Sequence, residues 1–365
     1  MPDTMTVKER WLAALHLQPV DRLPFWPKLR GSYQPAQEVP FQDMKLREIH
    51  DWIGSDRLER IPACATHRRQ RTSVRREESD NVRTFVYETP NGCMEQVRQF
   101  DAGSRSWPPV AFPIKKADDI GLMTEIFEDV RVELNREVLE RAQQAYRQHG
   151  DDAFVAHSIG ESPLMTFVEW LAGVKNAHLL LLDYEEEVEA LFDAMHRVLV
   201  ETAAILAEFD PGDALWMTEN TSTTLISPGQ FRHYCMQHLR EYAEICRSFG
   251  KPLFLHMCGH LKALLPDLET LPVHGFEAFT TPSLGNTTLL DGRTACPTKC
   301  LVGGTNAVLW TKPAGEIIET LERDLDVLPH HRGIVVTSAG VMPPLASPET
   351  IREVCEWVKQ YPAHM

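Results

Sequence analysis

The sequence lacks any apolar stretch close to the roughly 20 residues that a membrane-spanning helix requires. Its first residues, MPDTMTVKERW, lack the apolar core of a secretory signal. The eight cysteines are scattered along 365 residues without the close spacing of a disulfide framework. We therefore expect a cytoplasmic protein with reduced thiols and no membrane partner.

Positive charge is also scarce. Lys and Arg number 37 against 52 Asp and Glu, which leaves a net charge of −15. Binding to a phosphate backbone depends on clustered Lys and Arg, so we expect no nucleic-acid partner. The one basic run, HRRQRTSVRR at 67–76, precedes acidic residues and is interpreted as a solvated loop or hairpin edge.

No linker, low-complexity tract or repeat divides the chain, and we expect a single domain over residues 1–365. From about residue 120, short apolar strands alternate with amphipathic helices, a pattern typical of parallel strands buried on both faces. The predicted strands are 152–160, 213–220, 252–259, 275–282, 299–306 and 333–340, and the helices include 185–209 and 227–250. With two more strands expected in the N-terminal third, the pattern favours a (β/α)8 barrel, with a doubly wound open sheet as the alternative.

Two additions precede this regular part. The spacing predicts a helix over 6–17, where Thr6 and Glu9 form a capping-box pattern. Residues 84–100 contain two alternating runs around Pro-Asn-Gly, which predicts a β-hairpin. We therefore expect an α/β barrel with N-terminal helical and β-hairpin additions.

In such a barrel the functional groups lie at the C-terminal ends of the strands. The segment FLHMCGH, residues 254–260, ends an apolar strand with His256 and Cys258. Residues i and i+2 of a strand project to the same side, and thiolate with imidazole is a donor set that zinc prefers. An isolated H-x-C is equally compatible with an ordinary buried strand end, so both interpretations stay open here. A zinc site would need a third ligand, for which Glu219 is the first choice.

Other strand ends supply polar candidates. Burial of Glu219 beside Trp216 and Met217 would raise its pKa enough for acid–base work, although a helix cap or an Arg-bound carboxylate is the alternative. His157, Glu161 and Asn220 are predicted to line the same pocket; Glu161 alternatively caps a helix that begins near Pro163.

Several segments resemble the uroporphyrinogen decarboxylase superfamily, which includes cobalamin-dependent methyltransferases that act on coenzyme M. They are TVKERWLAALHLQPVDRLPFWP (6–27), GDALWMTEN (212–220), FLHMCGH (254–260), VGGTN (302–306) and SAGVMPPLASPETIREVCEWVK (338–359). The resemblance implies a (β/α)8 barrel and, in the methyltransferase branch, zinc held by the His and Cys of H-x-C with a third Cys near the C-terminal strand. His256 and Cys258 match, but Val341 stands at the third position.

The decarboxylase branch resembles this chain less. Its arginine-rich signature for substrate carboxylates is replaced by KLRGSYQPAQ (28–37), which keeps Arg30 and Tyr33 and lacks the paired arginines. Arg30 is expected to bind an anionic substrate group.

The resemblance therefore implies a methyltransferase that moves a methyl group between a small methylated substrate and the cobalt of a separate corrinoid protein. Zinc on His256 and Cys258 would act as the Lewis acid, with Glu219 as third ligand or proton donor. The alternatives are a metal-free decarboxylase and a non-catalytic barrel that binds a corrinoid or another tetrapyrrole. A homodimer is one option for the oligomeric state.

Overall fold

Eight parallel strands form the centre of the structure, a computed structural model that describes residues 3–365. Their hydrogen-bonding order is β1, β14, β13, β12, β11, β10, β9 and β2. From β9 to β14 neighbouring strands follow one another in chain order. Strand β1 pairs with β14 at one end of this order, and β2 pairs with β9 at the other. This is the predicted (β/α)8 barrel, and the open doubly wound sheet is excluded because its strand order would reverse.

The six predicted strands are present, and the two expected in the N-terminal third are the short β1 and β2. Their bounds are β1 Phe25–Trp26, β2 Leu58–Glu59, β9 Phe154–Ser158, β10 Ala214–Thr218, β11 Leu253–His256, β12 Gly275–Phe279, β13 Cys300–Gly303 and β14 Ile334–Thr337. Because both faces of a barrel sheet are covered, the strands are almost entirely apolar, which is why they could be found from composition.

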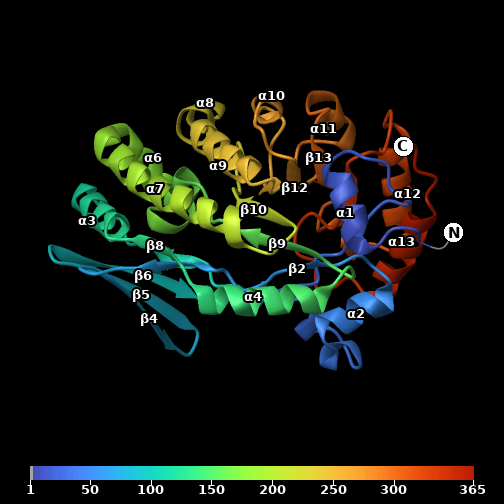
Figure 1. Ribbon diagram of the computed structural model, residues 1–365, viewed down its shortest axis with the longest axis horizontal. Coiled ribbons are helices and arrows are strands. Elements are labelled where there is room, and N and C mark those ends of the chain that lie inside the picture. The colour runs from blue at the N-terminus through green and yellow to red at the C-terminus, as the bar shows by residue number, and fades with distance from the viewer. Residues whose placement is uncertain (1–2) are drawn as a thin grey trace.

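Helices cover the outside of the barrel (Figure 1). The main ones are α2 Leu46–Ile53, α4 Arg136–His149, α6 Val174–Asp183, α7 Glu185–Phe209, α9 Met236–Ser248, α10 Leu265–Glu269, α11 Leu289–Ala295, α12 Ala314–Asp326 and α13 Pro348–Gln360. The predicted helix 185–209 coincides with α7, whereas the predicted helix 227–250 is divided into α8 (Pro228–Gln230), a π-type turn η4 (Phe231–Cys235) and α9. None of the helices described here combines the length and the hydrophobicity that a membrane crossing demands.

The β-hairpin addition and its neighbouring strands lie between β2 and α4. Strands β4 (Ser73–Ser79), β5 (Val82–Thr89), β6 (Gly92–Gln99) and β7 (Pro109–Ala111) form an antiparallel sheet, and β3 (Ala65–Arg68) pairs with β8 (Arg131–Leu134). The predicted hairpin is β5–β6. This sheet and helix α3 (Ala117–Glu128) lie at the opposite end of the molecule from α12 and α13 (Figure 1).

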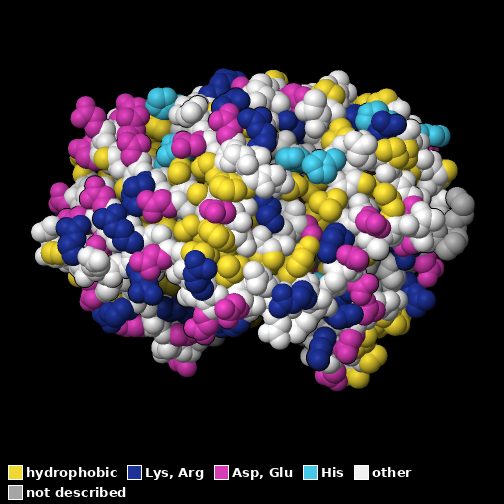
Figure 2. All heavy atoms as spheres, viewed as in Figure 1, with side chains coloured by type: hydrophobic (Ala, Val, Ile, Leu, Met, Phe, Trp, Pro, Cys, Tyr) yellow, Lys and Arg dark blue, Asp and Glu magenta, His cyan; other side chains and the backbone are white. Residues whose placement is uncertain are grey.

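The basic run 67–76 falls on β3 and β4, as a hairpin edge. Four of its five arginines pair with nearby carboxylates, including Arg68 with Glu133 at 2.9 Å and Arg75 with Glu88 at 2.8 Å. On the face shown in Figure 2, Lys and Arg side chains are interspersed with Asp and Glu. The run is therefore a charge-balanced surface strand rather than a patch of one sign.

Helix α1 (Val7–Leu15) packs against the N-terminal ends of the barrel strands. Trp11 is fully buried and stacks on Phe154, the first residue of β9, at 5.0 Å between ring centroids. Trp11 and Leu15 belong to one apolar cluster with Ala214 and Cys300, the first residues of β10 and β13. One end of the barrel is thus filled with side chains, which leaves the C-terminal end for a site.

Buried charges hold this helix in place. Asp56 is fully buried and accepts hydrogen bonds from Arg10 at 2.8 Å, from Arg22 at 2.9 Å and from the backbone N–H of Phe25 at 2.9 Å. Asp21 accepts from Arg10 at 2.7 Å. The Asp-Arg pair before β1 therefore ties α1 to the start of the first strand.

The predicted capping box is present at the start of α1: Thr6 Oγ1 accepts from the Glu9 backbone N–H at 3.2 Å, and a Glu9 carboxylate oxygen accepts from the Thr6 N–H at 2.8 Å. Replacing Thr6 with alanine should lower the free energy of unfolding by about 1 kcal/mol, since a helix N–H loses its acceptor. Urea denaturation measures this, with Thr320→Ala at a half-buried position of α12 as the control. An effect no larger than the control's would contradict the role of the cap.

Candidate active site at the C-terminal end of the barrel

Strand register decides which side chains face the barrel interior. Thr218 pairs with His256, and His256 pairs with Glu277 on the next strand. Trp216 and Phe254 share an interior cluster, so Thr218 and His256, two residues further along, project to the same side. Glu277 projects to the same side, because it pairs in register with His256. His256 therefore lies inside the barrel at its C-terminal end.

A cavity of about 220 Å³ opens beside His256. Its walls combine Trp26 and Trp216 with four charged side chains: Lys28, Arg30, Glu59 and Arg60. The predicted site residue Arg30 is in this wall, where it donates to Glu59 at 2.6 Å. Val341, the residue at the position of the third family cysteine, also lines the cavity.

Three charged groups form a chain in the barrel. His256 Nδ1 is hydrogen-bonded to a carboxylate oxygen of the fully buried Glu277, and the other oxygen of Glu277 accepts from Lys28 Nζ at 2.7 Å. Burial would raise the pKa of Glu277, but the positive charges of Lys28 and His256 lower it to about 2. Burial would lower the pKa of His256, but the Glu277 charge and bonds with Cys258 and Glu277 raise it to about 9.

A second group of polar side chains begins at Cys258. The thiol lies two residues beyond His256 in the chain and 3.9 Å from Asn220 Oδ1. The Asn220 amide in turn donates to Glu161 at 3.3 Å and to Glu169 at 3.1 Å. The structure therefore brings together the predicted residues His256, Cys258, Asn220 and Glu161, and adds Glu169.

Glu161 and Glu169 form a partly buried carboxyl pair. Burial raises the pKa of both groups, and the neighbouring negative charges of Glu169 and Glu219 raise that of Glu161 further. Two like charges in contact in a buried place favour sharing one proton. We therefore expect the pair to hold one shared proton near neutral pH.

Glu219 lies on the other side of the barrel wall. It follows Thr218, which faces inward, and its Oε1 accepts from Ser162 and Thr221, each at 3.0 Å. It is fully buried, and burial raises its pKa to about 7. Among residues 3–365, no set of three ligand groups that includes His256 or Cys258 has its ligand atoms within 4.8 Å of one another. In this arrangement Glu219 does not join those two residues.

His157 is also outside the cavity. Leu215, its partner on β10, belongs to the outer cluster between sheet and helices, and His157 Nδ1 lies 3.5 Å from Asp210. Burial lowers the pKa of His157. The side chain faces the surrounding helices rather than the site.

The sequence interpretation missed four residues that the structure places at the site: Lys28, Arg60, Glu169 and Glu277. For Glu277 a signal existed, because a carboxylate inside the apolar run GFEAF is rarely buried without a partner. Glu169 lies on the π-type turn η3 (Phe167–Leu171), and such turns are frequent at functional sites. Nothing in the local sequence of Lys28 or Arg60 separates them from surface cations.

Three residues with strained backbone angles lie at the same end of the barrel. Asn220, Ala278 and Ala339 have φ angles of 50°, 64° and 60°, a region that side-chain-bearing residues rarely adopt. At Ala278 the register of β12 against β13 shifts, directly after Glu277, and the carbonyl of Ala339 accepts from Lys28 Nζ at 3.0 Å. Strain of this kind persists where the surrounding structure enforces it, commonly at functional sites.

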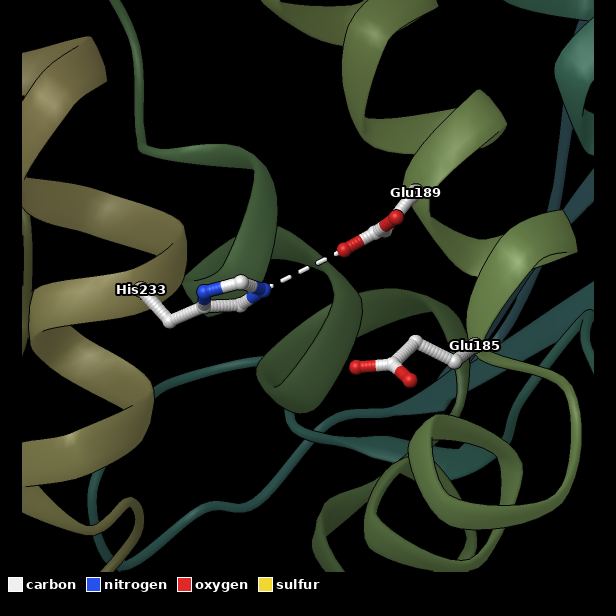
Figure 3. A group of neighbouring side chains, drawn as sticks. All are labelled: Glu185, Glu189 and His233. Carbon is white, nitrogen blue, oxygen red and sulfur yellow. Dashed lines mark hydrogen bonds and ion pairs between the residues drawn. The ribbon is translucent and has the colours of Figure 1, made fainter.

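A separate group of potential metal ligands lies on the outer helices: Glu185 and Glu189 of α7 and His233 of η4 (Figure 3). Glu189 and His233 are 3.2 Å apart, and Tyr234 donates to Glu185 at 3.1 Å. Exposed carboxylates of this type are common without a bound ion. The group lies outside the barrel and shares no residue with the cavity.

Comparison with known proteins agrees with the barrel. A methyltransferase from Methanosarcina mazei superposes with a TM-score of 0.63 at 16% identity, over 98% of this chain and 100% of that one. A B12-independent methionine synthase from Shewanella sp. W3-18-1 gives a TM-score of 0.51 at 12% identity, over 86% of this chain and 85% of that one. At these identities the likeness concerns the fold. No curated protein sequence matches the chain.

The family model described as uroporphyrinogen decarboxylase (URO-D) matches residues 98–361, which is more than half of the chain. The protein belongs to the uroporphyrinogen decarboxylase family. Members differ in chemistry, so the activity must be argued from the site.

Proposed function

We propose that the protein is a corrinoid-dependent methyltransferase with a zinc site on His256 and Cys258. One observation carries this proposal: a buried carboxylate holds Nδ1 of His256, which leaves Nε2 available in an imidazole that lines the cavity and precedes Cys258 by two residues. Zinc-bound histidines typically donate their other N–H to a carboxylate in this way. The methyltransferase name of a protein with the same fold supports the reaction class.

Two of the proposed ligands, His256 and Cys258, have donor atoms that suit zinc. The third ligand is not assigned. Imidazole nitrogen and thiolate sulfur are both preferred zinc ligands. Glu219, the third ligand proposed from the sequence, would have to leave its bonds to Ser162 and Thr221. When bound, zinc would supply Lewis acidity toward the oxygen or sulfur that carries the methyl group.

The chain's own residues prepare the site for this chemistry. Glu277 orients the His256 ring, and Lys28 balances the charge of that carboxylate. Asn220 connects Cys258 to the carboxyl pair of Glu161 and Glu169. In this proposal the pair gives a proton to the oxygen or sulfur of the substrate after its bond to methyl breaks, and the methyl group passes to the corrinoid cobalt of a separate protein.

The decarboxylase alternative has less support. A tetrapyrrole with eight carboxylates needs several unpaired cations, yet Lys28 and Arg30 in the cavity are already paired with Glu277 and Glu59. Pockets for drug-sized ligands have volumes of roughly 300–1,000 Å³. The cavity here, at about 220 Å³, is smaller and does not enclose a macrocycle. The same volume disfavours a non-catalytic tetrapyrrole-binding barrel.

Methyl transfer to free cob(I)alamin, used in place of the partner protein, tests the proposal. Zinc-loaded protein is incubated with a methoxyarene, a thioether or a methylamine, and methylcobalamin is followed by absorbance and the demethylated product by mass spectrometry. We expect conversion with one of these donor classes, and none with Cys258→Ser. Zinc-loaded protein that transfers no methyl group from any donor, and none from methylcobalamin to a thiol in the reverse direction, would contradict the proposal.

A further inference from the structure

Arg60 is the cation of the cavity wall that no acid neutralises. It directly follows β2, and its guanidinium lies 4.1 Å from the centroid of the Trp216 ring. Within residues 3–365 its side chain makes no hydrogen bond or ion pair, whereas Lys28 and Arg30 are each bound to a glutamate. Arg60 is also exposed to solvent, so its donors are accessible from the cavity. The wall therefore offers one free, forked donor of positive charge.

We propose that Arg60 binds the carboxylate of the substrate, and that the substrate is a small aromatic acid carrying a methoxy group. This inference rests on the proposed methyltransferase function and names its substrate class. Arginine suits a carboxylate because its planar fork can donate two parallel hydrogen bonds.

The remaining wall fits a flat apolar ring. Trp26 and Trp216 line the cavity together with Leu29, Leu58 and Val341. Aromatic side chains favour stacked or edge-on contacts with other rings. The cavity of about 220 Å³ limits the ligand to roughly one ring with short substituents. Since His256 is in the same wall, a ring bound by its carboxylate at Arg60 keeps a methoxy group within the cavity that contains the proposed zinc ligand.

The same residues disfavour a methylated amine. Quaternary ammonium groups are bound by open aromatic faces. Here Arg60 already lies over Trp216, and Lys28 Nζ lies 5.6 Å from the centroid of Trp26. A cationic substrate would meet two protein cations at the only tryptophans in the cavity wall, so an anionic substrate is electrostatically favoured.

Calorimetric binding to the zinc-loaded protein, without any corrinoid, tests the proposal. The probes are 4-methoxybenzoate, methoxybenzene, which lacks the carboxylate, and tetramethylammonium. Charge-assisted hydrogen bonds predict that the wild type binds 4-methoxybenzoate at least about tenfold more tightly than methoxybenzene. Arg60→Gln should abolish this preference, Arg60→Lys should keep part of it, and Arg323→Gln on the outer helix α12 should leave it unchanged.

Circular dichroism and thermal unfolding verify that the Arg60 variants remain folded. Equal affinity for 4-methoxybenzoate and methoxybenzene, or a preference that survives in folded Arg60→Gln, would overturn the proposal. So would tighter binding of tetramethylammonium. Methyl transfer from other donors without binding of 4-methoxybenzoate overturns this inference alone, whereas binding without any methyl transfer overturns the proposed function and leaves the anion site.

Discussion

Replacing Cys258 with serine should reduce the zinc content of the purified protein from about one ion per chain to background. Serine keeps the size of the side chain but removes the thiolate, and a site with few protein ligands does not retain the metal without it. Zinc is measured by mass spectrometry after purification without a metal-affinity tag. His256→Ala should have the same effect, because the imidazole is the other proposed ligand.

Two further variants make the zinc measurement specific. His233→Gln removes the exposed group of Glu185, Glu189 and His233, and should leave the zinc content unchanged if the barrel holds the ion. Glu219→Gln should also retain zinc, because the carboxylate is held by Ser162 and Thr221. Loss of zinc in Glu219→Gln would mean that this side chain turns to complete the site. Loss in His233→Gln alone, or folded wild-type protein without zinc, would refute the metal site at His256 and Cys258.

Replacing Glu277 with glutamine should lower the free energy of unfolding of the zinc-free protein by about 3 kcal/mol, since one partner of a buried ion pair is removed. Glu277 is fully buried between Lys28 and His256, so both cations lose their counter-charge. The pKa of His256 should fall from about 9 to below its ordinary value, because burial remains when the carboxylate is gone. Urea denaturation measures the stability, and NMR titration of the histidine ring measures the pKa.

The dependence on pH has a defined sign. The pKa of Glu277 is lowered to about 2, so its contribution is present above its ordinary pKa near 4.5 and is lost as the pH falls toward 2. The pKa of His256 is raised to about 9, so its contribution is present below about 6.5 and is lost as the pH rises through 9. The difference in stability between wild type and Glu277→Gln should therefore be largest between about pH 4.5 and 6.5.

Glu59→Gln is the matched control for this experiment. Glu59 pairs with Arg30 in the same cavity, but both side chains are partly exposed to water. Its replacement should cost less than about 1 kcal/mol. If Glu277→Gln were no more destabilising than Glu59→Gln, or if the pKa of His256 did not move, the buried ion pair would not have the role assigned to it.

The fold could be predicted from the sequence to a large extent. Strands β9 to β14 are apolar because helices cover them on one side and the barrel interior on the other, so burial is visible as composition. Helix α7 begins and ends as predicted, and the capping box of Thr6 and Glu9 is formed. The two N-terminal strands could be expected but not located, since β1 and β2 contain two residues each and show no periodicity.

The site could be predicted in part. His256 and Cys258 were selected because a thiol and an imidazole two residues apart follow a strand, and both lie at the C-terminal end of the barrel. The sequence pattern points to Glu219 and does not single out Glu277, whereas the structure places Glu277 beside His256. In a strand that is apolar on both faces, composition does not reveal which residues face inward, so the orientation of Glu219 was not determined.

The sequence by itself determined the class of fold, the capped first helix and the place where an imidazole and a thiol meet, because these features depend on local pattern and on the rule that barrel sites lie at the carboxyl ends of strands. Only the tertiary structure decided which carboxylate serves the histidine and which cation stays free. Lys28 follows β1, His256 ends β11 and Glu277 lies within β12, and these distant parts of the chain meet in the barrel. The charge of Arg60 is likewise unpaired because, in the part of the chain that the structure describes, the folded barrel places no carboxylate within bonding distance of it.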